Sequence, residues 1–191
     1  MKKIISGIVF VILLVGFIVL GTKEYKPKDQ TDNVVFSNEY QEIDENNIFV
    51  YTNASKVLST LRGGDGIIFF GFKSNVWAGY YANMLNSVAM SLGVDQIYYY
   101  DFLEDRKNHN GTYESIVDIL SPYLTVLDDG TKNLYSPSVV VVKNGQIMAF
   151  NDDTAFSKGN VTPAEYWTEI KVNAEKQTLY NLVSLYLIGE E

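Results

Sequence analysis

The chain has 191 residues, no cysteine, one histidine and a formal net charge of −8 at pH 7. Without cysteine it cannot form disulfides, thiolate metal sites or a cysteine nucleophile. An acidic chain also lacks the clustered lysine and arginine that nucleic-acid binding needs, so no nucleic-acid partner is expected. Its 14 tyrosines and 10 phenylalanines supply enough apolar surface for one domain with a sizeable core.

The N-terminal segment predicts a membrane anchor over residues 1–21. Two lysines precede an uncharged apolar run at residues 4–21, which as a helix would span roughly 27 Å, close to the hydrocarbon thickness of a bilayer. We expect a single-pass signal anchor in the cell membrane with the domain on the extracytoplasmic side. Cleavage after Gly21, which would release a secreted protein, is the alternative. Residues 22–45 are polar and predict a spacer before a domain over residues 46–191.

The first half of the domain alternates strands with helices. Asn53 can cap a helix, and the apolar run bracketed by Gly66 and Gly71 is typical of a buried central strand. Apolar residues then recur at three- and four-residue steps from Asn75 onward, which indicates an amphipathic helix. The expected elements are a strand at 47–51, a helix at 54–61, a strand at 66–71, a helix at 75–92, a strand at 96–100 and a helix at 112–123.

The second half of the domain predicts a hairpin and a final helix. Asn144-Gly145 lies between two apolar runs at 138–142 and 146–150, which is the strongest short-range hairpin signal. Thr162-Pro163-Ala164-Glu165 is a capping box with proline at the first helical position, and we expect one helix from there towards Ile188. The order of elements predicts an α/β fold with a mixed central sheet and flanking helices.

This order, with a long helix directly after the second strand, resembles the thioredoxin fold. A thioredoxin-like family of small secreted or anchored Gram-positive proteins carries Gly-Phe-x-x-Cys-Pro-Trp-Cys at this point. The chain reads Gly71-Phe72-Lys73-Ser74-Asn75-Val76-Trp77-Ala78 there. The fold also places a cis-proline just before its C-terminal hairpin, where the chain reads Ser136-Pro137-Ser138. The resemblance covers roughly residues 47–188 and implies a thioredoxin-like domain with a C-terminal hairpin plus helix.

The chain departs from that family at the residues that carry its chemistry. Asn75 and Ala78 stand where both cysteines would be, and Val76 replaces the proline between them, so Trp77 is the one match among these four positions. The family's reaction uses a thiolate at the helix N-terminus that a second thiol resolves. No catalytic role therefore carries over to this chain, and no cofactor is implied.

Each candidate site residue also has a plain structural interpretation. Asn75 would either cap its helix or contact a bound peptide. Trp77 would be either an exposed anchor beside a groove or part of the core face of its helix. Pro137, if cis, would place the backbone of Ser136 and Ser138 where an extended chain can pair with it, and otherwise it is an ordinary proline at the start of a strand.

The function expected from these residues is non-catalytic binding of an extended peptide or a partner protein, through positions 75–78 and 136–138. Two other classes stay open. One, by resemblance only, is a thiol-disulfide oxidoreductase or a disulfide-handling accessory protein. The other is a structural module of a membrane assembly that uses residues 4–21 for helix contacts. The lone His109 lies in a polar loop, and the acidic turns lack the spacing of a calcium loop, so no metal site is expected.

Overall fold

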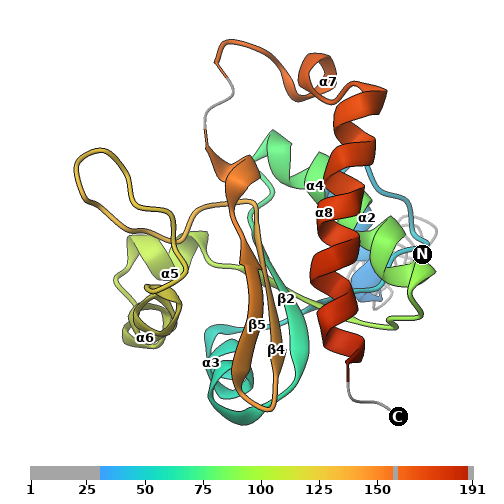
Figure 1. Cartoon of the computed structure of the whole chain (residues 1–191). Helices are drawn as coiled ribbons and strands as arrows, with labels where there is room; N and C mark the ends of the chain where they lie inside the picture. The colour runs from blue at the N-terminus through green and yellow to red at the C-terminus, as the bar shows by residue number, and fades with distance from the viewer. Residues whose placement is uncertain (1–30, 157–158, 189–191) are drawn as a thin grey trace, which may run out of the picture. The chain divides into compact units, whose positions relative to one another are not determined.

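The described part of the chain is built around one five-stranded sheet. The structure is a computed structural model that describes residues 31–156 and 159–188. The strands lie in the order β1-β3-β2-β4-β5, with helices against both faces of the sheet (Figure 1). Their bounds are β1 (Phe49–Tyr51), β2 (Gly66–Gly71), β3 (Ile97–Asp101), β4 (Ser138–Lys143) and β5 (Gln146–Asn151).

The sheet is mixed, as the sequence predicts. β1, β3 and β2 run parallel because helices connect them, whereas β4 is antiparallel to β2 and β5 is antiparallel to β4. Every residue of β2 is buried, which explains its uninterrupted apolar run. The predicted α/β class, with a mixed sheet and flanking helices, is therefore confirmed.

Three of the helices begin at asparagine caps: α3 at Asn53, α4 at Asn75 and α6 at Asn110. Asn53 caps α3 by accepting a hydrogen bond from the Lys56 N–H, as the sequence predicts. Asn110, two residues before the expected helix start, caps α6 through the N–H groups of Thr112 and Tyr113. The helices are α2 (Asp32–Glu39), α3 (Ala54–Gly63), α4 (Val76–Ser91), α5 (Leu103–Lys107), α6 (Gly111–Leu120), the 3-10 helix η1 (Asp153–Ala155), α7 (Pro163–Tyr166) and α8 (Glu169–Leu187).

Alternate residues of the central strands form two apolar layers. On β2, Ile67 and Phe69 pack with side chains of α2, α4 and α8, whereas Ile68 and Phe70 pack with side chains of α3 and α6. Figure 1 shows α4 and α8 against one face of the sheet and α3 and α6 towards the other. This is the period of two expected of a strand that is buried on both faces.

The hairpin between β4 and β5 turns at Asn144 and Gly145. Their φ angles of 51° and 72° are both in the left-handed region, as an Asn-Gly hairpin turn requires. Gly145 also lies against the end of α3, because a Cβ there would be 2.7 Å from the Gly63 nitrogen. The Gly145 N–H donates to the Gly64 carbonyl at 2.9 Å. Main-chain contacts therefore fix this turn.

Residues 31–45 pack as part of the described domain. The polar composition of residues 22–45 predicts a spacer, but three apolar side chains within it are buried: Phe36, Tyr40 and Ile43. The Phe36 ring stacks on Phe49 of β1 with 4.1 Å between the ring centroids. The expected anchor at 1–21 and the rest of the spacer lie outside the described residues. Within the described ranges, 31–156 and 159–188, none of the helices is long and apolar enough to cross a membrane.

The last helix differs from its prediction. The capping box forms as expected, since Thr162 and Glu165 bond reciprocally, but α7 ends at Tyr166 after a single turn. Trp167 leaves the helical conformation, with φ −78° and ψ 65°, and its ring contacts that of Tyr166 with 4.9 Å between the centroids. A new helix, α8, then begins at Glu169. The Trp167 side chain packs against the apolar layer that includes residues of α4 and α8, so the helix that the local sequence predicts is interrupted where a tertiary contact forms.

Candidate functional site

The candidate site lies at the end of the sheet where β2 ends and β4 begins. Because β4 is antiparallel to β2, Phe70 near the end of β2 pairs with Ser138 at the start of β4. The turn from β2 into α4 therefore meets the segment that precedes β4, although Asn75 and Ser136 are 61 residues apart in sequence. The two predicted segments thus come together. We call residues 72–78 and 135–138 the Asn75–Pro137 face.

Asn75 joins the two halves of this face. Its Oδ1 accepts a hydrogen bond from the Trp77 backbone N–H at 3.0 Å, which caps α4. Its Nδ2 donates to the Ser136 carbonyl oxygen at 2.6 Å and lies 3.2 Å from Ser136 Oγ. Both polar atoms of the Asn75 side chain are therefore engaged in contacts within the domain.

The segment before β4 is buried and bent. The Ser136–Pro137 peptide bond is cis, and Ser136, Pro137 and Ser138 are all buried. Ser138 Oγ donates to the Tyr135 carbonyl at 2.9 Å. Asn75 fills one of the two acceptor positions of the Ser136 carbonyl. A chain that approached this segment would therefore meet a carbonyl that is already hydrogen-bonded within the domain.

Trp77 is half-buried, and α7 covers it. The centroid of its ring lies 5.4 Å from that of Tyr166, at an interplanar angle of 68°. Ala78 is fully buried, whereas Val76 is 61% exposed. The sequence gives no signal for the Tyr166 cover, because only tertiary packing brings α7 to the start of α4. Val76, and not Trp77, is therefore the apolar side chain that this helix end presents to solvent.

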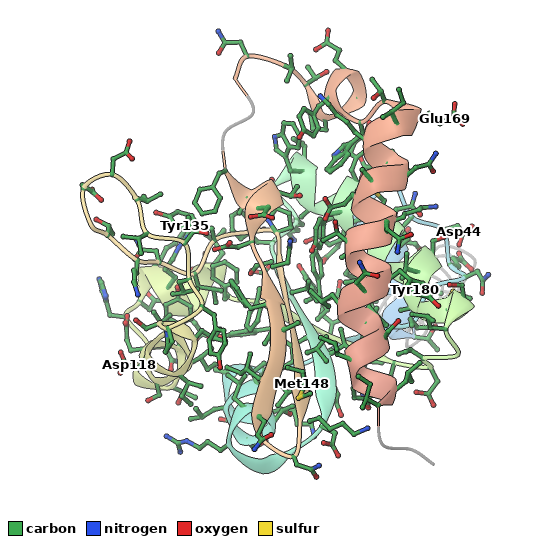
Figure 2. The ribbon with its side chains drawn as sticks, viewed as in Figure 1. Asp44, Asp118, Tyr135, Met148, Glu169 and Tyr180 are labelled. Carbon is green, nitrogen blue, oxygen red and sulfur yellow. The ribbon has the colours of Figure 1, made fainter. Side chains whose placement is uncertain are left out.

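Two half-buried aromatic side chains belong to the Asn75–Pro137 face. Tyr135 directly precedes Ser136, and its ring contacts Phe156 edge-on with 5.4 Å between the centroids; Figure 2 shows Tyr135 near the start of β4. Phe72 follows β2, and the Arg106 guanidinium lies 5.7 Å from its ring centroid. The accessible side chains of the face therefore combine these two rings and Val76 with the polar Lys73 and Ser74.

Charged side chains gather at the adjoining end of β3. Asp101 pairs with Gly71 in the sheet register, and Lys73 Nζ lies 3.7 Å from a Glu39 carboxylate oxygen. Partial burial raises the pKa of Asp101, and the negative charge of Glu39 adds to this, whereas the Leu103 N–H and Lys73 oppose it. This corner is therefore more tolerant of a protonated carboxyl than the rest of the surface.

The Asn75–Pro137 face offers no nucleophile activated by a base. Its serines bond to Asn75 and to the Tyr135 carbonyl. The chain's one histidine, His109, is exposed and lies 3.6 Å from Glu114, so neither serine has a histidine partner. Among the described residues, no three acidic or histidine side chains gather in a way that would hold a metal ion. The two serines of this face are therefore engaged in hydrogen bonds within the domain.

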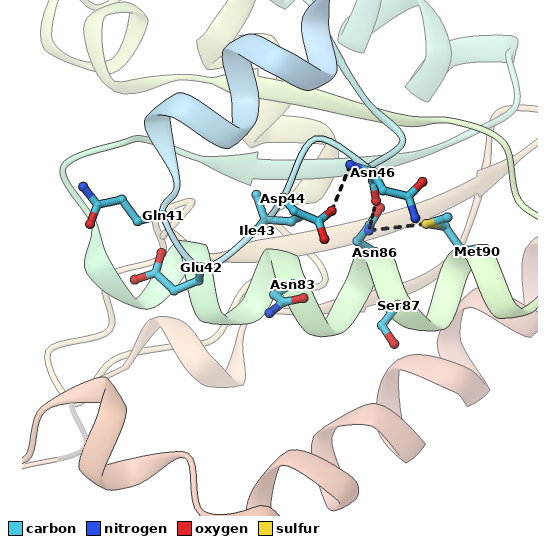
Figure 3. Close-up of a pocket in the computed structure, with 9 residues that line it drawn as sticks. All are labelled: Gln41, Glu42, Ile43, Asp44, Asn46, Asn83, Asn86, Ser87 and Met90. Atoms are coloured by element: carbon cyan, nitrogen blue, oxygen red, sulfur yellow. Dashed lines mark hydrogen bonds between the residues drawn. The ribbon is translucent and has the colours of Figure 1, made fainter.

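A polar groove of about 510 Å³ lies elsewhere, between the turn after α2 and the middle of α4 (Figure 3). Asn86 forms part of it and holds residues 46–48 onto α4, because its Oδ1 accepts from the Ile48 N–H and its Nδ2 donates to the Asn46 carbonyl. The Glu42 carboxylate packs against Gly79, where a Cβ would clash with it. The groove thus includes contacts that attach residues 31–48 to the domain.

Comparison of the sequence with models of known protein families finds no match, and comparison with curated proteins finds no similar sequence. Sequence similarity therefore assigns the chain neither a family nor an activity. A proposal of function has to rest on the fold and on the residues of the Asn75–Pro137 face.

Proposed function

We propose that the chain is a cysteine-free member of the thioredoxin-like proteins that binds a peptide or partner protein without catalysing a reaction. The mixed five-stranded sheet with flanking helices is compatible with that fold. A helix that starts directly after β2, beside a cis-proline that directly precedes β4, supports the same assignment. Asn75 and Ala78 occupy the N-cap and third positions of α4, where this family carries its two cysteines.

The observation that carries the proposal is the pair of hydrogen bonds from Asn75 to Ser136. They satisfy the polar groups at the former reaction centre, so the face is stable without a thiol. Removing the thiols leaves the shape of the face but not its chemistry. A surface of this kind can still bind a partner, because binding needs complementary contacts and no reactive atom.

The exposed side chains favour apolar contact over strand pairing. One acceptor position of the Ser136 carbonyl is filled by Asn75, which weakens the case for adding an extended chain at this point. Val76 is 61% exposed, and Phe72 and Tyr135 are half-buried beside the same turn. We therefore propose that an apolar side chain of the partner contacts Val76, with Phe72 and Tyr135 at the edge of the contact.

We further propose that residues 1–21 anchor the protein in the cell membrane, with the domain on the extracytoplasmic side. The support is the uncharged apolar run at residues 4–21 after two lysines, which is long enough to cross a bilayer. In such a location, the partner is either another extracytoplasmic protein or an exposed loop of a membrane protein.

The test is in-cell photocrosslinking from position 76 of the full chain. Replacing Val76 with a photoreactive residue is expected to capture one dominant protein. The control is Met90, which is 37% exposed at the other end of α4 and about 21 Å away at 1.5 Å per residue. Capture from both positions alike would contradict a specific contact at this face. Insulin reduction above the buffer rate would contradict the non-catalytic assignment.

A further inference from the structure

A small cavity of about 130 Å³ lies between α4 and the start of α8, beside the cover of Trp77. Its floor is apolar, with Met84 of α4 and Val172 of α8, and its polar groups come from both helices and from the segment between α7 and α8. At about 30 Å³ per water molecule in the liquid, the volume suits roughly four waters or one small organic molecule. The lining residues are Tyr80, Asn83, Met84, Trp167, Val172 and Lys176.

The indole nitrogen of Trp167 is the unusual group in this lining. It is buried, and among the described residues it has no hydrogen-bond partner. A buried donor without an acceptor is costly, and in folded proteins most such donors find a partner in protein, water or ligand. Because Trp167 lines the cavity, an acceptor inside the cavity would remove this cost.

The charges around the cavity favour a negative acceptor. Lys176 lines it, and its Nζ lies 3.3 Å from Ser87 Oγ on α4. Lys171, one turn earlier on α8, lies 3.7 Å from the ring centroid of Tyr166. The other charged residues of this stretch, Glu165, Glu169 and Glu175, do not line the cavity. Lys176 is therefore the charged side chain of the lining, and a negative group inside the cavity would gain from its charge.

We propose that this cavity binds a small aliphatic carboxylate, with the carboxylate accepting from the Trp167 indole N–H and pairing with Lys176. The hydrocarbon part would lie against Met84 and Val172, which are buried and half-buried respectively. The size limits this part to a short chain. The binding site is separate from the Val76 contact and does not depend on the function proposed above.

The chain offers a direct probe, because Trp77 and Trp167 are its two tryptophans. We would record the indole N–H signals of the full-length, ¹⁵N-labelled chain in detergent micelles and assign them with Trp77→Phe. Sodium butyrate is the test molecule, with butyramide and butylamine as controls of the same chain length. Butyrate is expected to shift the Trp167 signal to saturation, and butyramide to bind about tenfold more weakly because it carries no charge.

Two substitutions separate binding from folding. Lys176→Met keeps the length of the side chain and is expected to weaken butyrate binding about tenfold, because the charge-assisted contact is lost. Lys107→Met, which removes a lysine paired with Glu104 on α5, is expected to leave binding unchanged. Two results would overturn the proposal. One is that butyrate does not shift the Trp167 indole N–H signal, which would leave water as the acceptor in the cavity. The other is that Lys176→Met binds butyrate as tightly as the natural chain does.

Discussion

The side-chain nitrogen of Asn75 lies 2.6 Å from the main-chain oxygen of Ser136, while the oxygen of the same amide accepts the Trp77 N–H. One neutral side chain therefore caps α4 and ties the helix start to the segment before β4. A cysteine at such a helix N-terminus would have its thiolate stabilised by the helix dipole. Here that position serves structure.

Asn75→Ala should lower the free energy of unfolding by about 2 kcal/mol, half from the lost cap and half from the unpaired Ser136 carbonyl. The matched control is Asn53→Ala, because Asn53 only caps α3; its expected cost is about 1 kcal/mol. Equilibrium urea unfolding followed by circular dichroism measures both. Equal losses for the two variants would mean that the tie to Ser136 contributes nothing.

Phe36→Ala should cost about 3–5 kcal/mol, the usual effect of removing a buried aromatic ring. The reason is that Phe36 is 0% exposed and contacts the rings of Phe49 and Tyr99. Asn38→Ala, an exposed change in the same helix, should stay within about 0.5 kcal/mol of the natural chain. If Phe36→Ala were equally mild in urea unfolding, α2 would not belong to the cooperative domain.

Asp101→Asn should change how stability depends on pH. The pKa of Asp101 is raised in the folded state above its ordinary value of 3.8, so the folded chain holds this proton to higher pH than the unfolded chain. The stability contributed by the protonated carboxyl is complete below 3.8 and is lost as pH rises through the raised pKa. The variant should therefore gain in thermal midpoint over the natural chain as pH rises.

Asp129 provides a control of opposite sign for that measurement. Its pKa is lowered by hydrogen bonds from Thr131, so its contribution is present above the ordinary value and is lost as pH falls. The thermal midpoint of Asp129→Asn should therefore fall relative to that of the natural chain as pH rises towards neutral. Parallel behaviour of the two variants between about pH 3 and pH 7 would show that the local surroundings of Asp101 do not set its titration.

Asn75→Cys with Ala78→Cys should create a pair that can form a disulfide. The two positions are three residues apart across the first turn of α4, which places the Cα atoms within the distance that a disulfide spans. After mild oxidation, thiol titration should find no free thiol in the double variant. Asn75→Cys alone should react readily, since Asn75 is partly exposed, whereas Ala78→Cys alone should react slowly, because Ala78 is fully buried. Two free thiols after oxidation would contradict the assignment of these positions.

Local signals in the sequence predict the parts of the fold that depend on neighbouring residues. The Asn144-Gly145 turn, the Asn53 cap and the Thr162 capping box all involve atoms within a few residues of each other. The α/β class follows from the alternation of apolar runs, because each run has the period of its element. These features therefore need no knowledge of the tertiary structure.

Features that depend on contacts between residues far apart in the chain could not be predicted from the sequence. Residues 32–39 show no strong apolar stripe, and the helix there is held by Phe36 against β1. Likewise, α7 ends where the Trp167 side chain packs against the apolar layer that includes residues of α4 and α8. At the site, the cap by Asn75 could be predicted, but its bond to Ser136 and the cover of Trp77 by Tyr166 could not. Each joins segments that meet only after the sheet has formed.

The hairpin turn at Gly145 has a consequence for how the sequence can change. At that end of the sheet, backbone lies directly on backbone, and any side chain at position 145 would collide with the main chain of Arg62 and Gly63. At the other end, the hydrogen bond between the start of α4 and the segment before β4 comes from one side chain, that of Asn75. Position 145 therefore admits only glycine, whereas position 75 can change without a collision of main chains.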